Sequence, residues 1–230
     1  MAVTRLMVDP GHGGPPAPGL NYGATGNGLI EKDLALRLGL KLRDLAPDVV
    51  RMTRSKDVNL ALTRRADIAN AAEAEIFLSL HCNGYHDPSA RGYEDFHASG
   101  STKGAELTRS VHDQVMTVLP FDCPDRGVKH ANYTVLTHTR MPAVLVELGF
   151  ITNGADAAWL AQDKNLEAIA QALLLGCNVE VEKPDPKPVP SPPDGVIASK
   201  EVLVVESREI KDVIRSLHDS IEMLDNIIKG

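Results

Sequence analysis

Apolar residues follow two different rhythms along the first 180 residues of the chain. Short unbroken apolar runs, such as residues 76–80, are typical of strands that are buried on both faces. Between these runs, apolar residues recur every three or four positions, which is the spacing of one helix face. The pattern predicts strands at residues 5–9, 49–53, 76–80, 92–97, 133–136 and 143–146, with 92–97 at an edge of the sheet. It predicts helices around residues 34–45, 60–72, 107–118 and 166–174, the last with Asp163 as its N-cap.

The order of these elements indicates the fold class. Strands that alternate with helices favour an α/β domain with a mainly parallel sheet flanked by helices. We place this domain at residues 1–180. In such sheets ligands bind beyond the carboxyl ends of the strands, so polar residues at strand ends are candidates for a functional site.

The C-terminal part of the chain has a different pattern. Residues 181–196 contain the proline-rich stretch KPDPKPVPSPPDG, which is typical of an extended linker. In the remaining element, residues 197–230, isoleucines and leucines recur on alternating three- and four-residue steps between positions 210 and 228. This seam predicts a helix that cannot bury its apolar stripe alone. We expect it to self-associate, to pack within a small module or on a partner, or to dock onto the first domain.

Charge and composition exclude several classes of protein. The formal net charge of −7 argues against a nucleic-acid enzyme, because phosphate backbones select basic surfaces. The three cysteines (Cys82, Cys123 and Cys177) have no tight spacing, so we expect neither a disulfide framework nor a thiolate zinc site. The N-terminus lacks the apolar run of a signal peptide, and no stretch approaches the roughly 18 apolar residues of a membrane span. We therefore expect no membrane span, and a chain that stays in the cytosol until something releases it.

Four polar residues occupy positions where the fold alone does not require a polar side chain. His12 follows the first predicted strand in a glycine-rich turn, and His81 follows the run at 76–80. Glu147 ends another apolar run, and Glu31 opens a helix. Two histidines and a carboxylate form a zinc-binding set, and a second carboxylate that does not bind the metal can move a proton. Taken singly, each histidine is more typical of an ordinary polar residue at a strand end, and Glu31 of a favourable first-turn acid.

Six ordered motifs resemble the zinc-dependent N-acetylmuramoyl-L-alanine amidases of the amidase-3 type. They are MVDPGHGG (7–14), EKDLALRL (31–38), MTRSKDVNLALTRRADIAN (52–70), FLSLHCNG (77–84), RGVKHANYTVL (126–136) and PAVLVELGFITN (142–153). Together they span nearly all of residues 3–177, which makes the signal far more specific than a lone motif. The resemblance implies a twisted, mainly parallel sheet flanked by helices. It also implies hydrolysis of the amide bond between N-acetylmuramic acid and the L-alanine of the peptidoglycan stem peptide.

The resemblance assigns roles to the four polar residues. The implied metal ligands are His12, Glu31 and His81. They would bind one Zn²⁺ ion and leave one position open for water, while Glu147 would be the catalytic carboxylate. Asn83 and Asn132 are candidates for substrate binding from their positions alone. The expected partner is therefore bacterial peptidoglycan, and not a nucleic acid or a membrane.

The biological role leaves several alternatives open. The missing signal peptide favours a phage endolysin that stays in the host bacterial cytoplasm until it is released to the cell wall, with a C-terminal element for oligomerisation or wall binding. A sporulation mother-cell autolysin of the same chemistry would not need a signal peptide either. A zinc carboxypeptidase or endopeptidase acting on stem peptides would keep the metal and cut another bond. A non-catalytic wall-binding module with a structural zinc would use Glu147 as a fourth ligand.

Overall fold

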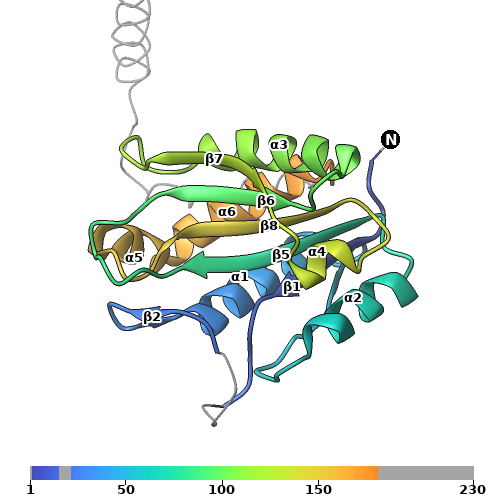
Figure 1. Ribbon diagram of the computed structural model, residues 1–230, viewed down its shortest axis with the longest axis horizontal. Helices are drawn as coiled ribbons and strands as arrows, with labels where there is room; N and C mark the ends of the chain where they lie inside the picture. Colours follow the sequence, from blue (N-terminus) through green and yellow to red (C-terminus); the bar gives the residue numbers. More distant parts are fainter. Residues whose placement is uncertain (1, 16–21, 181–230) are drawn as a thin grey trace, which may run out of the picture. The chain divides into compact units, whose positions relative to one another are not determined.

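The computed structural model describes residues 2–15 and 22–180 (Figure 1). The chain divides into two units, Met1–Lys183 and Pro184–Gly230, and every described residue belongs to the first. The predicted linker at 181–196 and the predicted helix at 210–228 lie outside the described residues. Within the described part, no helix combines the length and the apolar character that crossing a membrane requires.

Strands and helices alternate along the described chain, as the sequence predicts for an α/β domain. The strands are β1 (Leu6–Pro10), β2 (Thr25–Gly26), β3 (Leu29–Ile30), β4 (Val50–Met52), β5 (Ile76–Asn83), β6 (Tyr93–His97), β7 (Asp125–His130) and β8 (Ala143–Phe150). The helices are α1 (Glu31–Leu45), α2 (Leu62–Ala71), α3 (Thr102–Met116), α4 (Thr134–Thr137), α5 (Gly154–Leu160) and α6 (Asp163–Gly176).

A six-stranded sheet forms the centre of the unit, in the order β4-β1-β5-β8-β6-β7. β1 runs parallel to β4 and β5, β5 runs parallel to β8, and β6 runs parallel to β7, while β6 and β8 are antiparallel. The predicted mainly parallel sheet is thus confirmed. The predicted edge position of residues 92–97 is wrong, because β6 lies between β8 and β7. The pattern does not predict the edge strand β7, because its sequence, DRGVKH, shows no apolar alternation.

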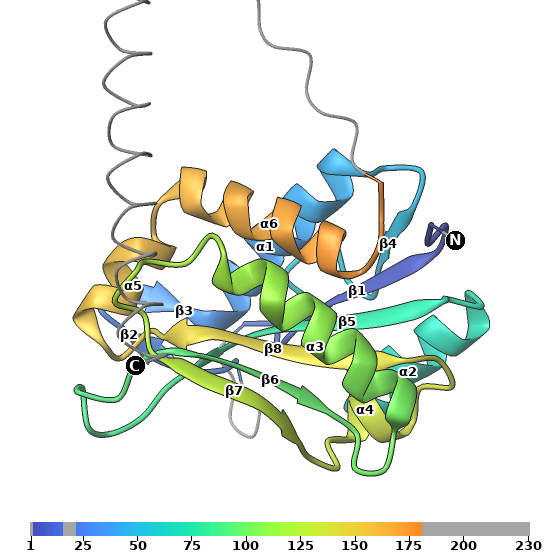
Figure 2. The ribbon, with the colours of Figure 1, turned by 90° about the horizontal axis from the view of Figure 1, so that it is seen from above.

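Helices cover the two faces of this sheet unequally. In Figure 2, α1, α3 and α6 lie along one face, and the shorter helices α2 and α4 lie on the other. The first face packs a large apolar cluster that contains Leu78 and Val146, while the second packs a smaller cluster that contains Phe77 and Leu145. Because side chains alternate along a strand, the residues two positions after Phe77 and Leu145 stay on the second face.

Helix α1 is fixed on the first face by the leucine spacing that the sequence predicts. Leu34, Leu38 and Leu42 are at most 2% exposed and belong to the large cluster. Full burial of one such side chain stabilises the fold by about 1.5–3 kcal/mol. This packing anchors the helix whose first residue is Glu31.

Two local predictions are wrong. Residues 133–136 were expected as a strand, but α4 forms a single helical turn there. Short apolar runs do not distinguish a strand from a buried helical turn, and here Val135 and Leu136 pack into the smaller cluster beside β8. Asp163 is not the N-cap of α6: Gln162 occupies that position and Asp163 is the first helical residue, where an acidic side chain still favours the helix dipole.

Candidate metal centre and active site

Three side chains from distant parts of the chain meet beside the carboxyl ends of β1 and β5. His12 lies in the loop after β1, Glu31 begins α1, and His81 lies near the end of β5. Each offers one potential ligand atom, and these atoms all lie within 4.8 Å of one another. Glu31 is central, because its Oε1 lies 2.8 Å from Nδ1 of His81 and 3.1 Å from Nε2 of His12. Two imidazoles and a carboxylate that converge in this way suit a single Zn²⁺ ion.

The backbone of the loop after β1 takes a constrained path to bring His12 to this point. His12 has a φ angle of 54°, in the left-handed region that residues with a side chain rarely adopt. The preceding residue, Gly11, runs directly against the ring of His81: a Cβ atom at Gly11 would lie 2.4 Å from Cε1 of that ring. A glycine at this position is therefore required for the loop to approach β5 so closely.

A tight hairpin delivers Glu31 to the same point. β2 and β3 pair antiparallel around Asn27 and Gly28, which both have positive φ angles, as in a type I′ turn. The chain then enters α1 directly at Glu31. The backbone N–H of Ala24, just before the hairpin, donates a 2.7 Å hydrogen bond to Oε2 of Glu31. This bond fixes the second carboxylate oxygen, while Oε1 faces the two histidines and also accepts a 3.1 Å hydrogen bond from the backbone N–H of Cys82.

The charge state of Glu31 suits metal binding. The residue is only 4% exposed, and burial alone would raise the pKa of its carboxyl group. Hydrogen bonds and charge from His12 and His81 outweigh burial and hold this pKa well below its ordinary range. Glu31 is therefore an anion, which is the state that a metal ligand needs.

Glu147 lies next to these three residues on the neighbouring strand. The parallel register of β5 and β8 pairs Glu147 with His81, so the two side chains share a face of the sheet. Its Oε2 atom is buried and has no hydrogen-bond partner among the described residues. Burial, followed by the charges of Glu31 and Glu94, raises the pKa of Glu147 well above its ordinary value. Such a carboxyl group is suited to acid–base chemistry.

A cavity of about 670 Å³ opens beside these groups. His12, His81 and Glu147 supply polar groups to its wall. Its apolar side comes from the segments that begin α2 and α4 and from β8, through Leu60, Leu62, Tyr133, Val135 and Leu145. A mostly apolar cleft with a few convergent polar groups is the usual form of a small-molecule or peptide site.

A family model matches nearly all of the described unit. The family model described as N-acetylmuramoyl-L-alanine amidase matches residues 6–178. The chain belongs to this amidase family. The match covers every element of the described fold, from β1 to α6, and all four residues of the candidate site.

Individual relatives support the assignment to the amidase family. N-acetylmuramoyl-L-alanine amidase CwlM of Bacillus licheniformis is 35% identical over 175 residues, which cover 74% of this chain and 65% of CwlM. The endolysin of Bacillus phage SPP1 is 35% identical over 174 residues, which cover 72% of this chain and 62% of the endolysin. The solved structure of amidase AmiC2 of Nostoc punctiforme matches with a TM-score of 0.68 at 30% identity, over 77% of this chain and 97% of that one. The chain thus spans less than two thirds of the two curated relatives.

Within the amidase fold, the two candidate asparagines lie in different surroundings. Asn132 lines the cavity just before α4, so it stays a prediction for substrate binding. Asn83 lies on β5, and its Nδ2 donates a 2.8 Å hydrogen bond to Oε1 of Glu94 on β6. Asn83 thus orients Glu94, and its role in substrate binding stays a prediction.

Two buried arginines that sequence reasoning left without a role hold the loop of His12. Arg54 donates to the carbonyl oxygens of Pro10 and Gly11 at 2.9 and 2.8 Å. Arg65 donates to the carbonyl oxygen of His12 at 2.6 Å and forms a buried ion pair with Asp9 at 2.8 Å. Both arginines lie inside the motif at 52–70, but sequence alone gives no sign that such long cations are buried.

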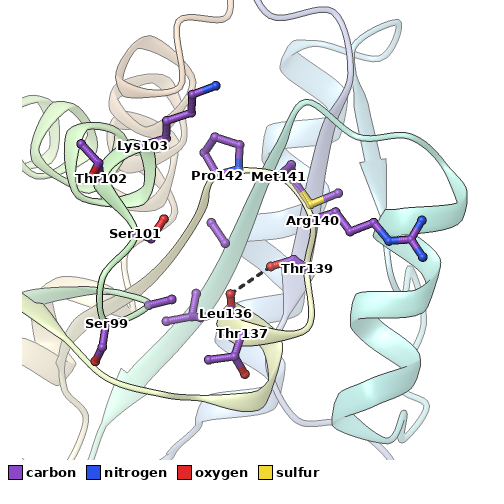
Figure 3. Close-up of a pocket in the computed structure, with 12 residues that line it drawn as sticks. Ser99, Ser101, Thr102, Lys103, Leu136, Thr137, Thr139, Arg140, Met141 and Pro142 are labelled. Carbon is purple, nitrogen blue, oxygen red and sulfur yellow. Dashed lines mark hydrogen bonds between the residues drawn. The ribbon is translucent and has the colours of Figure 1, made fainter.

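A second cavity, of about 530 Å³, lies on the other side of α4 at the start of β8 (Figure 3). Hydroxyl groups line it, from Ser99, Ser101, Thr102, Thr137 and Thr139. Figure 3 shows the side chains of Lys103 and Arg140 extending away from the other lining residues. None of the described residues that line it carries a carboxylate or an imidazole, so the candidate chemistry belongs to the first cavity.

Proposed function

We propose that this chain hydrolyses the amide bond between N-acetylmuramic acid and the L-alanine of the peptidoglycan stem peptide, with one Zn²⁺ ion as its cofactor. The observation that carries the proposal is the convergence of His12, Glu31 and His81 within 4.8 Å beside Glu147. Family membership supports the choice of bond, since the matching family model carries this activity in its description.

The donor set fits zinc. Two imidazole nitrogens and one buried carboxylate are the ligands of many catalytic zinc sites, which keep a fourth position for water or substrate. When bound, the ion supplies a polarised substrate carbonyl and a water that is acidic near neutral pH. Glu147 does not belong to the three-residue group, which favours a separate role over that of a fourth ligand.

Glu147 acts in this proposal as the proton carrier. It faces the cavity next to His81, and its buried Oε2 has no competing partner among the described residues. The carboxylate accepts a proton from the attacking water and then donates it to the amide nitrogen of L-alanine as the C–N bond breaks. The raised pKa of Glu147 makes its carboxylate a stronger base, which suits the acceptance of a proton from water.

Mass analysis of fragments from purified peptidoglycan tests the reaction. We expect the chain to free stem peptides that begin with L-alanine and to leave the glycan intact, and we expect a chelator to stop the release. A fragment with any other new amino group would instead indicate a peptidase. No release of fragments would rule out both enzymes and favour a wall-binding module.

The substitution Glu147→Gln tests the role of the proton carrier. We expect it to lower kcat by about 10²–10⁴-fold, because general acid–base catalysis contributes this much. Zinc content should stay stoichiometric, because the amide replaces a group that is not a ligand. Glu106→Gln, an exposed residue on α3, is the matched control and should behave like the parent chain. Loss of zinc together with activity in Glu147→Gln would mean that Glu147 binds the metal.

We further propose a role as a phage endolysin that is kept in the host cytoplasm until lysis. The 35% identity to the SPP1 endolysin supports this role. The test is to produce the chain in a bacterium and to follow turbidity before and after the membrane is permeabilised. Rapid clearing only after permeabilisation, absent for Glu147→Gln, is the expected result. Clearing without permeabilisation would contradict retention in the cytoplasm.

A further inference from the structure

A row of charged side chains continues from Glu147 across the sheet. The antiparallel register of β8 and β6 pairs Glu147 with Glu94, so these side chains share a face. The next strand, β7, contributes Arg126 and Lys129, and both side chains reach Glu94. The proposed acid–base and metal chemistry does not use these three residues. Glu94 lies one strand from Glu147, and Arg126 and Lys129 lie two strands from it.

Glu94 is a buried anion that binds three donors. It is 6% exposed, and it accepts hydrogen bonds from Asn83 at 2.8 Å, from Nε of Arg126 at 2.9 Å and from Nζ of Lys129. Burial alone would raise the pKa of Glu94, but these donors outweigh burial and lower it below its ordinary value. The carboxylate therefore keeps its negative charge.

The cluster carries one surplus positive charge. Arg126 and Lys129 are two cations, and Glu94 is the single described carboxylate that forms an ion pair with either of them. Their side chains are 36% and 39% exposed, so both cations are open to solvent. A chain with a net charge of −7 thus presents an unbalanced cation beside its active site.

Aromatic rings hold both cations in place. The guanidinium carbon of Arg126 lies 4.8 Å from the centre of the Phe150 ring, and Nζ of Lys129 lies 5.9 Å from the centre of the Phe96 ring. Together with the ion pairs to Glu94, contacts of this kind restrict a long side chain before a ligand arrives. A fixed, exposed cation pair loses little freedom on binding, which favours recognition of an anion.

We propose that Arg126 and Lys129 bind a carboxylate of the stem peptide, on the peptide side of the scissile amide. This inference rests on the proposed amidase function. The sugars of the glycan are neutral and the lactyl carboxyl group is consumed in the amide, so the carboxylates of the substrate lie in the peptide. The nearest is the α-carboxylate of the residue after L-alanine, a glutamate in unamidated peptidoglycan. Arginine and lysine are the side chains best suited to such a group.

The spacing of the sheet agrees with this position. Neighbouring strands lie about 4.8 Å apart, so the head groups that meet at Glu94 lie roughly one strand spacing from Glu147. Consecutive Cα atoms in a peptide are about 3.8 Å apart, so the residue after L-alanine lies a similar distance from the scissile bond. A stem peptide that crosses β6 would bring its carboxylate to the two cations.

Two substrates that differ in one group test the inference. They are solubilised glycan strands whose stem peptides carry either D-glutamate or D-isoglutamine, its α-amide, after L-alanine. We expect the parent chain to have a KM about tenfold lower for the free acid, because a charge-assisted hydrogen bond is lost in the amide. Arg126→Gln and Lys129→Gln should each raise KM for the acid several-fold and by more than for the amide, so that the difference between the two substrates shrinks.

Arg109→Gln is the matched control, because Arg109 is an exposed arginine on α3, which packs on the other sheet face. It should leave both KM values as in the parent chain. Equal KM values of the parent chain for the two substrates would overturn the inference while leaving the amidase function intact. An equal loss on both substrates in Arg126→Gln and Lys129→Gln would also overturn it, since that outcome means a structural role. Failure of the parent chain to cut either substrate would overturn the amidase function itself.

Discussion

Gly11 shows how a single missing side chain can position a candidate metal ligand. The loop after β1 passes so close to β5 that a Cβ atom at Gly11 would lie within 2.4–2.7 Å of three atoms of the His81 ring. Its φ angle is not in the left-handed region, so the constraint comes from space rather than from backbone strain. The glycine therefore sets where His81 can point.

We expect Gly11→Ala to lower zinc affinity without unfolding the chain. The added methyl group must push the ring of His81 aside, and disturbed ligand orientation typically costs about 10–100-fold in metal affinity. Competition with a chromogenic chelator measures this loss. Gly154→Ala is the matched control, because a Cβ atom there meets nothing within 4 Å. An unchanged affinity in Gly11→Ala would show that the loop yields instead of the ring.

The sequence predicts which residues belong to the candidate site, but not the contacts that hold them there. His12, His81 and Glu147 were predicted from apolar runs that end in a polar residue, and Glu31 from the start of a helix, because strand ends of a parallel sheet share one edge. The side chains that hold the loop of His12 in place could not be predicted from the sequence. Long cations are usually exposed, so nothing in the pattern indicates that Arg54 and Arg65 are buried against the loop of His12.

At the scale of elements, the apolar runs do not show that side chains of a strand alternate between the two faces of the sheet, only one of which carries the candidate site. The stretch IFLSLHCN of β5 looks uniformly apolar at its start, yet its residues divide between two faces. Leu78 and Leu80 pack under α1, while Ser79 and His81 face the other way, toward Asp9 and the candidate metal site. Hydrophobicity alone does not show this division. The side chains of β5 on the second face of the sheet, the face that carries α2 and α4, become polar only near the end of the strand.

Elements with weak or ambiguous patterns were the ones mispredicted. β7 carries Asp125, Arg126 and Lys129 and has almost no apolar residues, because its open face holds the cluster around Glu94. The hairpin of β2 and β3 was also missed, although Asn27-Gly28 is a strong turn signal, because its strands are only two residues long. Tertiary contacts, rather than local propensity, decide these segments.

Helix α3 is attached to the sheet through a buried histidine, which predicts a dependence of stability on pH. His112 on α3 lies between Asp95 on β6, at 2.8 Å, and Asp125 on β7, at 3.1 Å. The hydrogen bond to Asp95 raises the pKa of His112 above its ordinary value of 6.5. Burial raises the pKa of Asp95 from 3.8 to about 6.

Both shifts have the same sign. The folded chain binds more protons than the unfolded chain at these two groups, so their contribution to the free energy of unfolding falls as pH rises from 3.8 to above 6.5. We expect the double variant Asp95→Asn/His112→Asn to show a flatter dependence over this range in urea titrations. His138→Asn, an exposed histidine, is the control and should keep the slope of the parent chain. Equal slopes for the double variant and the parent chain would contradict the prediction.

At the scale of the whole molecule, the candidate metal centre joins parts of the chain that are far apart in sequence. His12, Glu31 and His81 come from a loop, a helix start and a strand. The resemblance to the amidase family predicts that these residues share a site, because they stand at the positions of the family's metal ligands. The sequence does not show how a bound metal changes the stability of the chain. A ligand that binds the folded chain but not the unfolded chain stabilises the folded chain.

Zinc should therefore raise the thermal midpoint of the chain. At a free zinc concentration 100 times the Kd, binding adds about 2.7 kcal/mol to the free energy of unfolding. For a domain of this size each kcal/mol shifts Tm by about 2–4 °C, so we expect a rise of about 5–10 °C over the chelated chain. Glu31→Gln should lose most of this rise, because the amide removes the central anionic ligand, while Glu75→Gln, which changes a carboxylate beside Arg5, should keep it. An equal rise in Glu31→Gln and the parent chain would mean that zinc stabilises the chain from a different site.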